Sequence, residues 1–467
     1  MVERRQQSLA EYAAPIAASF FVMAFELARG AKDSMWLDES FSFAVAKRPL
    51  GSFLEFVWSQ EANMGPYYLV LWGWIRLDDG DLWIRALSAL FTVAALWGIW
   101  LLVRRWSGQV VAAVAVGVFV FTPYVLSWSM QARSYSMAMA FTAWSMVFAD
   151  QMMKQKGRWP SVVFGAMVGL AVATQISTVF VFVGVVLAIW LLVPTWETTR
   201  KLALAGIAAM ATFAPFAFAA ISNPDHASWI PRLTPSVFWT ELTSATSGPL
   251  WALLIGSGWV CLIVASFRDA RFRPYLIALA GSVSGVLVLV MVSVWLKPMF
   301  INRYLIGCLP LAVIAAVGGW SALWPRRWPI VAGAVIGISA LTLGVSFERT
   351  RPTLEDYRSA AAIVESSMQP GDAIVAIGGY QISGLVRYLP EGTPTETLVS
   401  SPTNPGSWTL RAKDGSEVQS DRVWIVYRDI RPSRELGDWI DRTYPVVVLD
   451  NKFEDIQLEL RETRSGQ

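Results

Sequence analysis

Residues 82–105 read LWIRALSALFTVAALWGIWLLVRR, and this stretch predicts a helix that crosses a membrane. Its apolar part is long enough to span the core of a bilayer, and it ends at the basic pair Arg104-Arg105. The whole chain has 467 residues, 55% of them hydrophobic and 16% charged. Soluble domains are about a quarter charged, so the composition indicates an α-helical membrane protein with many spans.

Apolar runs of spanning length recur along most of the chain, and we expect about eleven transmembrane helices. They cover residues 10–30, 82–103, 109–127, 134–152, 161–175, 176–194, 201–221, 249–267, 274–296, 304–323 and 328–347. The apolar segment 66–77 is too short to cross a bilayer. We interpret it as a helix that lies on the outer face.

The distribution of basic residues supports this threading. If the N-terminus with Arg4-Arg5 is cytoplasmic and residues 66–77 do not cross, every densely basic loop falls on the cytoplasmic side, as the positive-inside rule requires. These loops hold Arg104-Arg105, Lys154/Lys156/Arg158, Arg200-Lys201, Arg268/Arg271/Arg273 and Arg326-Arg327. Counting residues 66–77 as a span would invert all of them. The sequence therefore predicts a multi-pass protein of the cytoplasmic (inner) membrane.

Two extracytoplasmic regions follow from this threading. The first outer loop, residues 31–81, contains the amphipathic stretch Pro49 to Trp58, which predicts a helix in the membrane interface. Residues 348–467 read as a small α/β domain, while residues 1–347 form the transmembrane domain. In the α/β domain we expect a strand at 373–378 and buried strands at 423–427 and 446–449, with a helix at 433–443. We interpret this domain as accessory or acceptor-binding.

Asp38 and Glu39 form an acidic pair in the first outer loop. A carboxylate beside an acceptor hydroxyl can act as a general base if burial and neighbouring charge tune its pKa. The pair could equally be solvated or could cap the helix that follows. Its apolar neighbours Trp36-Leu37 and Phe41 favour a pair held at an apolar surface.

Several cations come just before, or just inside, the outer ends of helices. These are Arg85, Arg133 and Arg303, the last followed by Tyr304, with Lys297 as a fourth candidate. A guanidinium binds phosphate oxygens through a planar, bidentate fork. One such arginine would more often anchor a helix at the interface, but three of them favour a binding site for a phosphate-bearing substrate.

Other polar and aromatic residues are predicted on the same side. The stretch EANMGPYY, residues 61–68, offers Glu61, Asn63, Tyr67 and Tyr68 as contacts for an acceptor or sugar, although the tyrosines fit an interfacial aromatic belt better. His226, the only histidine, could assist acid–base chemistry, although a surface role fits it better. One histidine cannot make a metal site, and we expect neither a metal nor another cofactor.

The order of several motifs resembles that of a known family. These motifs are WLDES (36–40), DLWIRALSAL (81–90), TPYVLSWSMQARSY (122–135) and FINRYLIGCLP (300–310). Together they resemble bacterial GT-C glycosyltransferases of the protein-mannosyltransferase and aminoarabinose-transferase-like group, over residues 10–347.

This resemblance implies a function and a site. It implies transfer of a sugar, mannose- or pentose-like, from a polyprenyl monophosphate to a glycan, glycolipid or protein of the cell envelope. Transfer would take place on the outer face of the membrane, with inversion at the anomeric carbon. Asp38 would be the base, and Arg85, Arg133 and Arg303-Tyr304 match the family's arginine positions. Relatives often carry Asp and His before the tyrosine pair, where this chain has Glu61 and Met64.

Two other functions remain open at the level of the sequence. A flippase or transporter for a lipid-linked sugar predicts charges near the middle of the membrane, whereas these spans are nearly free of charge. A polysaccharide ligase that uses a lipid diphosphate would also need outer arginines. No block of basic residues indicates a nucleic-acid partner.

Overall fold

The computed structural model describes residues 9–30, 32–222, 230–323, 333–334, 337, 355–377, 382–400, 407–428, 432–453 and 455–464. The chain divides into two compact units. The helical unit comprises Met1–Ala31 and Arg48–Arg351, and the α/β unit comprises Lys32–Lys47 and Pro352–Gln467. The sequence had predicted a single division of the chain at residues 347/348. The structure differs from that prediction because residues 32–47 group with the C-terminal part.

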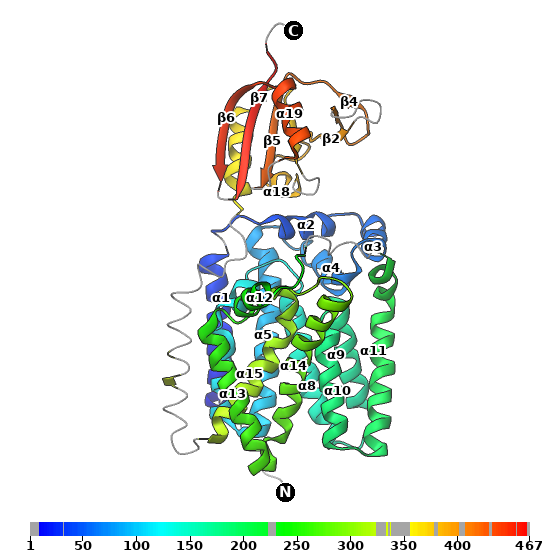
Figure 1. The fold of residues 1–467 in the computed structure, drawn as a ribbon, viewed down its shortest axis with the longest axis vertical. Helices are drawn as coiled ribbons and strands as arrows, with labels where there is room; N and C mark the ends of the chain where they lie inside the picture. The colour runs from blue at the N-terminus through cyan, green and yellow to red at the C-terminus, as the bar shows by residue number, and fades with distance from the viewer. Residues whose placement is uncertain are drawn as a thin grey trace. The chain divides into compact units, whose positions relative to one another are not determined.

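The helical unit consists of α-helices and short 3-10 helices, the latter labelled η (Figure 1). In chain order these are η1 (Leu9–Tyr12), α1 (Ala13–Arg29), α3 (Leu50–Ser59), η2 (Ala62–Met64), α4 (Gly65–Trp74), α5 (Asp81–Ser107), α6 (Gln109–Val120), α7 (Pro123–Ser129), α8 (Tyr135–Lys154), α9 (Trp159–Thr174), α10 (Thr178–Leu192), α11 (Trp196–Ser222), α12 (Pro235–Ala245), α13 (Pro249–Arg268), η3 (Ala270–Phe272), α14 (Arg273–Trp295), η4 (Asn302–Cys308) and α15 (Leu309–Leu323). Each apolar run predicted between residues 10 and 323 coincides with helix, while the run 328–347 falls almost entirely outside the described residues.

Not all of these helices are long enough to cross a membrane by themselves. Among the described residues, four are long and apolar enough: Asp81–Ser107, Pro249–Arg268, Ala270–Trp295 and Asn302–Ala322. A fifth span is available if α6 and α7 count as one, although they meet at an angle of 66°. Pro123, which cannot donate a backbone hydrogen bond, stands at the start of α7. The chain is thus a multi-pass membrane protein, and the number of eleven spans stays a prediction.

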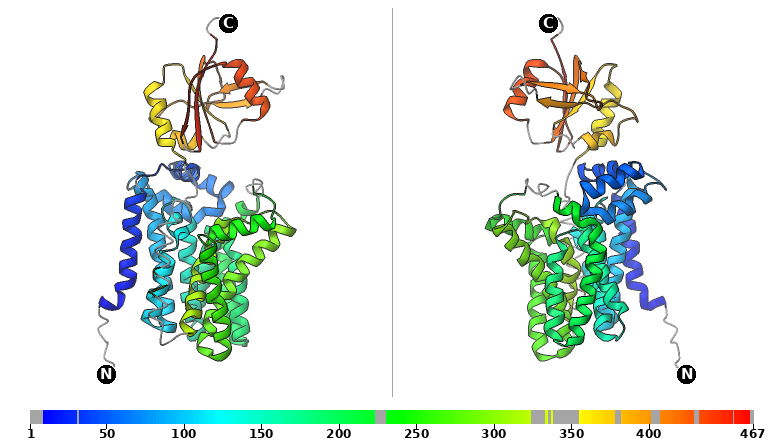
Figure 2. Two further views of the ribbon diagram at one scale, coloured as in Figure 1. Left: turned by 60° about the vertical axis from the view of Figure 1, so that its left-hand side comes forward. Right: turned by 90° about the vertical axis from the view of Figure 1, so that its right-hand side faces the viewer.

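The helices pack in pairs through small residues. Figure 2 shows the bundle from two sides, with α1 along its edge, where it contacts α5 and α6. Gly258 on α13 faces the backbone of Ala316 on α15, and a Cβ added at Gly258 would lie 2.5 Å from the Ala316 carbonyl oxygen. Gly169 on α9 approaches α11 in the same way. Such close approach favours association of helices in a membrane, where lipid and side chains are equally apolar.

Two short helices fit the prediction that the first outer loop does not span. The stretch predicted at 66–77 forms α4, which has only 10 residues. Helix α3 buries Phe53 and Val57, two of the apolar residues that its amphipathic pattern places on one face, whereas Leu50 at the start of the helix is exposed.

Three of the five basic loops predicted to share one side of the membrane meet in the structure, while Arg326-Arg327 lies outside the described residues. Arg104 at the end of α5 forms an ion pair with Glu11 at 2.6 Å. The Asp150 carboxylate of α8 pairs with Lys154 at 2.8 Å and with Arg105 at 3.8 Å. Lys201 of α11 donates to the carbonyl oxygen of Gln155. These contacts gather the ends of α5, α8 and α11 at one end of the bundle, which we call the basic end.

The α/β unit contains one main sheet and one small sheet. The main sheet has the order β1-β5-β7-β6, with β1 parallel to β5 and the other neighbours antiparallel. The small antiparallel sheet has the order β2-β3-β4. The helices and strands of the α/β unit, in chain order, are α2 (Leu37–Ala46), α17 (Tyr357–Ser367), β1 (Ala373–Ala376), α18 (Ile382–Val386), β2 (Thr397–Ser400), β3 (Trp408–Arg411), β4 (Glu417–Val418), β5 (Arg422–Arg428), α19 (Arg434–Thr443), β6 (Val446–Phe453) and β7 (Ile456–Glu462).

The predicted strands and helix of this unit are present, with one correction. The segments at 373–378, 423–427, 446–449 and 433–443 correspond to β1, β5, β6 and α19. Strand β6 is not buried as predicted, because it lies at the edge of the sheet and Val446, Val447 and Val448 are 41–50% exposed. Strand β7 and the small sheet were not predicted.

We expect Gly258→Val to destabilise the helical unit by about 1–3 kcal/mol, because the new side chain must push α15 away. Gly256→Val on the same helix is the matched control, since an added Cβ there meets nothing within 4 Å. Thermal unfolding in detergent should show a lower transition temperature for Gly258→Val only. Equal transitions for the two variants would contradict the close α13–α15 contact.

Candidate functional site

The acidic pair lies on the first turn of α2, in the α/β unit. Glu39 is fully buried, and its carboxylate accepts a hydrogen bond from the Trp36 backbone N–H at 3.3 Å. A carboxylate three residues into a helix that reaches back to the preceding backbone is part of a capping box. Asp38 is half-buried, and its carbonyl oxygen accepts a hydrogen bond from Ser42 Oγ. Sequence analysis had considered that the acidic pair caps the following helix. In the structure Glu39 makes such a capping contact.

In the helical unit, a chain of polar contacts joins three segments that sequence analysis had selected. The Tyr67 hydroxyl of α4 lies 3.5 Å from Ser88 Oγ of α5. Ser88 Oγ donates to the carbonyl oxygen of Arg133 at 3.3 Å, in the turn before α8. The motifs around residues 67, 85 and 133 therefore meet at one end of the bundle, which we call the polar end.

Asn63 and Tyr304 join the same end through the turn between α9 and α10. Asn63 Oδ1 accepts a hydrogen bond from the Ile176 N–H at 3.1 Å. Ser177 Oγ donates to the carbonyl oxygen of Tyr304 at 2.8 Å. The polar turn that separates two apolar runs in the sequence is thus where η2 and η4 attach.

Arg303 and Tyr304 lie in η4 and are half-buried. Glu241 of α12 accepts a hydrogen bond from the N–H of Asn302 at 2.7 Å, and the Phe238 and Phe300 rings pack with their centroids 5.2 Å apart.

Sequence analysis missed Glu241. The residue lies in α12, in the connection between α11 and α13, and it had no charged partner near it in the sequence that could have marked it.

Arg85 is buried and has a structural contact. Its guanidinium donates to the carbonyl oxygen of Gly30, which follows the end of α1. The last carbonyl groups of a helix lack partners inside the helix, so a cation there satisfies and stabilises them. Arg85 thereby fixes α1 to α5.

Two buried polar side chains flank Arg133. Gln131 and Ser134 are at most 6% exposed, yet Gln131 Oε1 and Ser134 Oγ have no hydrogen-bond partner among the described residues. A buried polar atom without a partner costs about 1–3 kcal/mol, so such atoms mark places where a ligand or water completes the structure. Arg133 itself is half-buried.

The remaining predicted residues are placed less informatively. Tyr67 and Tyr68 are fully buried, which corrects the interpretation that they lie in an interfacial belt. Glu61 is half-buried just before η2, and Lys297 is half-buried in the connection between α14 and η4. His226 lies outside the described residues. Among the residues that the structure describes, no three His, Cys, Asp or Glu side chains converge on one point.

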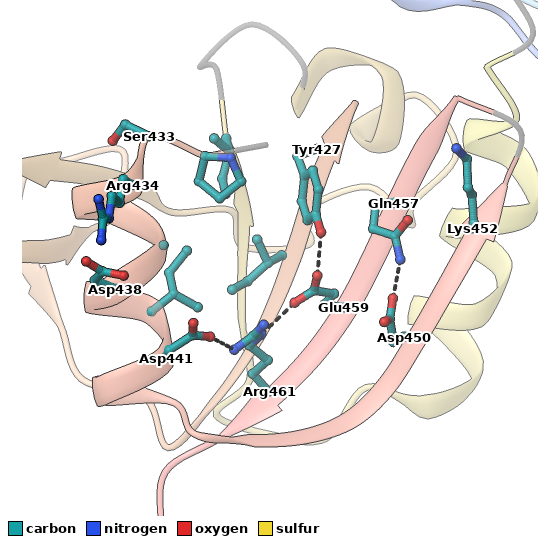
Figure 3. A pocket seen from close by; sticks show the side chains of 15 residues that line it. Tyr427, Ser433, Arg434, Asp438, Asp441, Asp450, Lys452, Gln457, Glu459 and Arg461 are labelled. Carbon is teal, nitrogen blue, oxygen red and sulfur yellow. Dashed lines mark hydrogen bonds and ion pairs between the residues drawn. The ribbon is translucent and has the colours of Figure 1, made fainter. Parts of the chain in front are cut away.

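The α/β unit also contains a polar cavity of about 580 Å³ between α19 and the main sheet. Arg461 lies between Glu459 and Asp441 on its wall, and the Tyr427 hydroxyl donates to Glu459 at 2.5 Å (Figure 3). Burial raises the pKa of Tyr427, and the adjacent Glu459 carboxylate raises it further. Arg461 is thus paired with both Glu459 and Asp441 on this wall.

Comparisons with known proteins support the fold. Residues 63–218 match the family model described as "Dolichyl-phosphate-mannose-protein mannosyltransferase". ArnT from Cupriavidus metallidurans in its apo state is 14% identical, with a TM-score of 0.66 over 97% of each chain. The same protein bound to undecaprenyl phosphate is 13% identical, with a TM-score of 0.64 over 98% of each chain.

An archaeal protein is similar as well. The Archaeoglobus fulgidus oligosaccharyltransferase, in complex with Zn and sulfate, is 11% identical with a TM-score of 0.54, and the match covers 89% of this chain and 68% of that one. A sequence search of curated proteins found no match. The chain therefore has the fold of the GT-C glycosyltransferases, as its motifs had indicated.

Proposed function

We propose that this GT-C-fold protein transfers a sugar from a polyprenyl monophosphate donor to a glycan, glycolipid or protein of the cell envelope. The observation that carries the proposal is the polar end, where Tyr67, Ser88 and Arg133 join through hydrogen bonds and Arg303 lies in the adjacent η4. The likeness to ArnT over nearly the whole of both chains supports it, because that protein binds undecaprenyl phosphate. The sugar is mannose- or pentose-like, by the resemblance of the motifs.

The proposed reaction is a single displacement. The Asp38 carboxylate takes the proton of an acceptor hydroxyl, whose oxygen forms a bond to the anomeric carbon from the face opposite the phosphate. The bond between that carbon and the phosphate oxygen breaks, and its electrons leave with the polyprenyl phosphate. One displacement inverts the anomeric configuration, and the reaction needs no covalent nucleophile.

Arg133 and Arg303 are the proposed phosphate ligands. The leaving phosphate gains negative charge in the transition state, and guanidinium groups positioned beforehand stabilise that charge strongly in a dry site. Gln131 and Ser134, whose buried oxygens lack partners among the described residues, would bind the donor's hydroxyl groups next to Arg133. Arg85 would act through the α1–α5 contact.

We also propose the location and polarity. The basic end would face the cytoplasm, because positively charged loops are retained there, and the polar end would face outward. The membrane would be the inner membrane. The N-terminus would be cytoplasmic, and the α/β unit, which carries Asp38, would be extracytoplasmic.

We expect Asp38→Asn to lower the rate of sugar transfer by about 10²–10⁴-fold, the usual contribution of a general base. Glu39→Gln is the matched control, because its amide oxygen still accepts the Trp36 N–H and its rate should stay near that of the wild type. The assay is transfer in proteoliposomes from a panel of polyprenyl-monophosphate sugars. Equal losses in the two variants, or none in Asp38→Asn, would contradict the role of Asp38.

We expect Arg133→Gln and Arg303→Gln each to weaken donor binding and slow transfer by about tenfold or more, because each removes one charge-assisted contact to phosphate. Arg76→Gln is the control, since Arg76 is exposed and stacks on Trp72 with its guanidinium carbon 3.7 Å from the ring centroid. Transfer rates measured against donor concentration separate binding from turnover. An effect of Arg76→Gln as large as the others would refute a specific phosphate site.

We expect transfer to continue at an unchanged rate in the presence of a metal chelator, because arginines carry the charge of the leaving phosphate. The measurement is the initial rate with and without chelator, followed by addition of divalent ions. Loss of activity that a divalent ion restores would show that a metal is required.

A further inference from the structure

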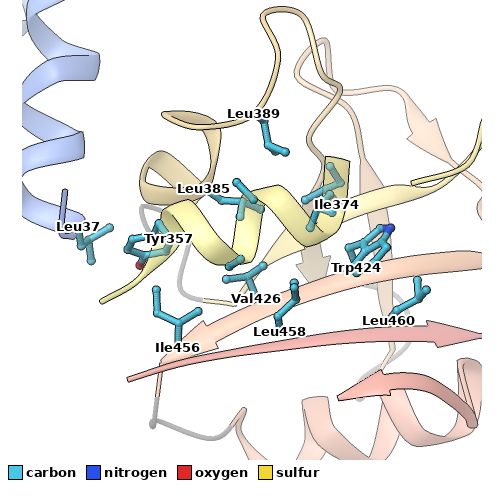
Figure 4. Packing of buried hydrophobic residues seen from close by; sticks show 13 residues of the cluster. Leu37, Tyr357, Ile374, Leu385, Leu389, Trp424, Val426, Ile456, Leu458 and Leu460 are labelled. Carbon is cyan, nitrogen blue, oxygen red and sulfur yellow. The ribbon is translucent and has the colours of Figure 1, made fainter. Parts of the chain in front are cut away.

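The segment that carries Asp38 is part of the α/β unit. Residues Lys32–Lys47 group with Pro352–Gln467 rather than with the helices that precede and follow them in the chain. Leu37 is 1% exposed and belongs to the hydrophobic core of this unit, where it lies beside Tyr357 (Figure 4). Helix α2 therefore begins inside the core of a domain more than 300 residues away in sequence.

A carboxylate of that domain supplies the missing cap of α2. The residue before the helix, Trp36, has no side-chain oxygen, so it cannot accept a hydrogen bond from the first helical N–H groups. Glu355 Oε2 accepts the N–H of Leu37, the first helical residue, at 2.8 Å. A negative charge at this place also interacts favourably with the helix dipole.

Glu355 is itself firmly held. Its side chain is fully buried, and its other carboxylate oxygen, Oε1, forms an ion pair with Arg428 Nε of β5 at 3.0 Å. Burial raises the pKa of Glu355, while Arg428 and the Leu37 N–H oppose that rise and favour the charged form. The charge of Asp38 also raises the pKa of Glu355, which shows that the two carboxylates are close enough to interact.

Further contacts hold the segment on both sides of Asp38. Before it, the Met35 N–H donates to the Tyr388 hydroxyl at 2.7 Å. After it, the Arg387 guanidinium lies 4.1 Å from the centroid of the Phe43 ring. The segment is thus attached to the α/β unit at three successive points.

We propose that Glu355, oriented by Arg428, is a positioning residue for transfer: it fixes the start of α2 and thereby the place of the Asp38 carboxylate. This inference rests on the proposed function, because it takes Asp38 as the base. A displacement of about 1 Å in a catalytic group can cost on the order of 10²-fold in rate, so a loosened cap is enough to affect turnover.

The chain offers a matched control. Glu396 is also a buried carboxylate of the α/β unit, 7% exposed against 4% for Glu355. It accepts one backbone N–H, that of Ile374 in β1, at 2.7 Å. Glu396→Ala should therefore disturb the unit to a similar degree as Glu355→Ala without removing the cap of α2.

The first measurement is hydrogen exchange of the amides at residues 35–42 in the full-length protein. We expect Glu355→Ala to speed exchange at Leu37 about tenfold or more, Glu355→Gln to have a smaller effect because it keeps an acceptor oxygen, and Glu396→Ala to have none. Unchanged exchange in Glu355→Ala would overturn the proposal. This readout does not depend on sugar transfer.

The second measurement is the kinetics of transfer in proteoliposomes. We expect Glu355→Ala to lower kcat by about 10- to 100-fold with little change in the KM for the lipid donor, and Glu355→Gln to recover most of the rate. An unchanged kcat despite faster exchange, or an equal loss in Glu396→Ala, would overturn the positioning role. If the wild type transfers no sugar, the proposed function fails, the positioning role fails with it, and the exchange data still decide whether Glu355 caps α2.

Discussion

The fold depends on the need to satisfy every backbone hydrogen bond without water inside the membrane. Helices meet this need within themselves, and polar side chains are then confined to the ends of the bundle or must be partnered. The helical unit follows this constraint closely, with glycines such as Gly258 allowing helices to approach and polar contacts gathered at its two ends. One end is basic and holds ion pairs near the ends of α5 and α8, whereas the other collects hydroxyl, amide and guanidinium groups.

This separation makes the polar end a suitable place for chemistry on a lipid substrate. There Ser88 of α5 is hydrogen-bonded to the turn 130–134, and Ser177 in the turn between α9 and α10 is hydrogen-bonded to η4. The backbone contacts fix the segments, and side chains such as Arg133 and Arg303 remain only half-buried. In these segments the backbone carbonyl oxygens hold the structure together, while the side chains next to them are the candidate ligands for a substrate.

Much of the fold could be predicted because it depends on local patterns. Long apolar runs gave the helices, and the alternation of basic loops placed Arg104, Lys154 and Lys201 on one side, where the structure brings their segments together. Long-range features carried no such signal. The contact between Leu37 and Glu355 joins residues 318 apart, and Glu241 of α12 accepts the backbone N–H of Asn302, the residue before Arg303. The exposed β6 looked buried because three consecutive valines read alike at the edge and in the centre of a sheet.

The central claim is transfer of a sugar from a lipid monophosphate, and product analysis tests it most directly. Purified protein in proteoliposomes would be given a polyprenyl-monophosphate sugar and an acceptor preparation from the cell envelope, and the lipid and sugar products would be measured together. The account predicts release of polyprenyl monophosphate in an amount equal to the sugar transferred, with inverted anomeric configuration in the product. Movement of intact donor across the bilayer without release, or reaction with diphosphate donors alone, would contradict it.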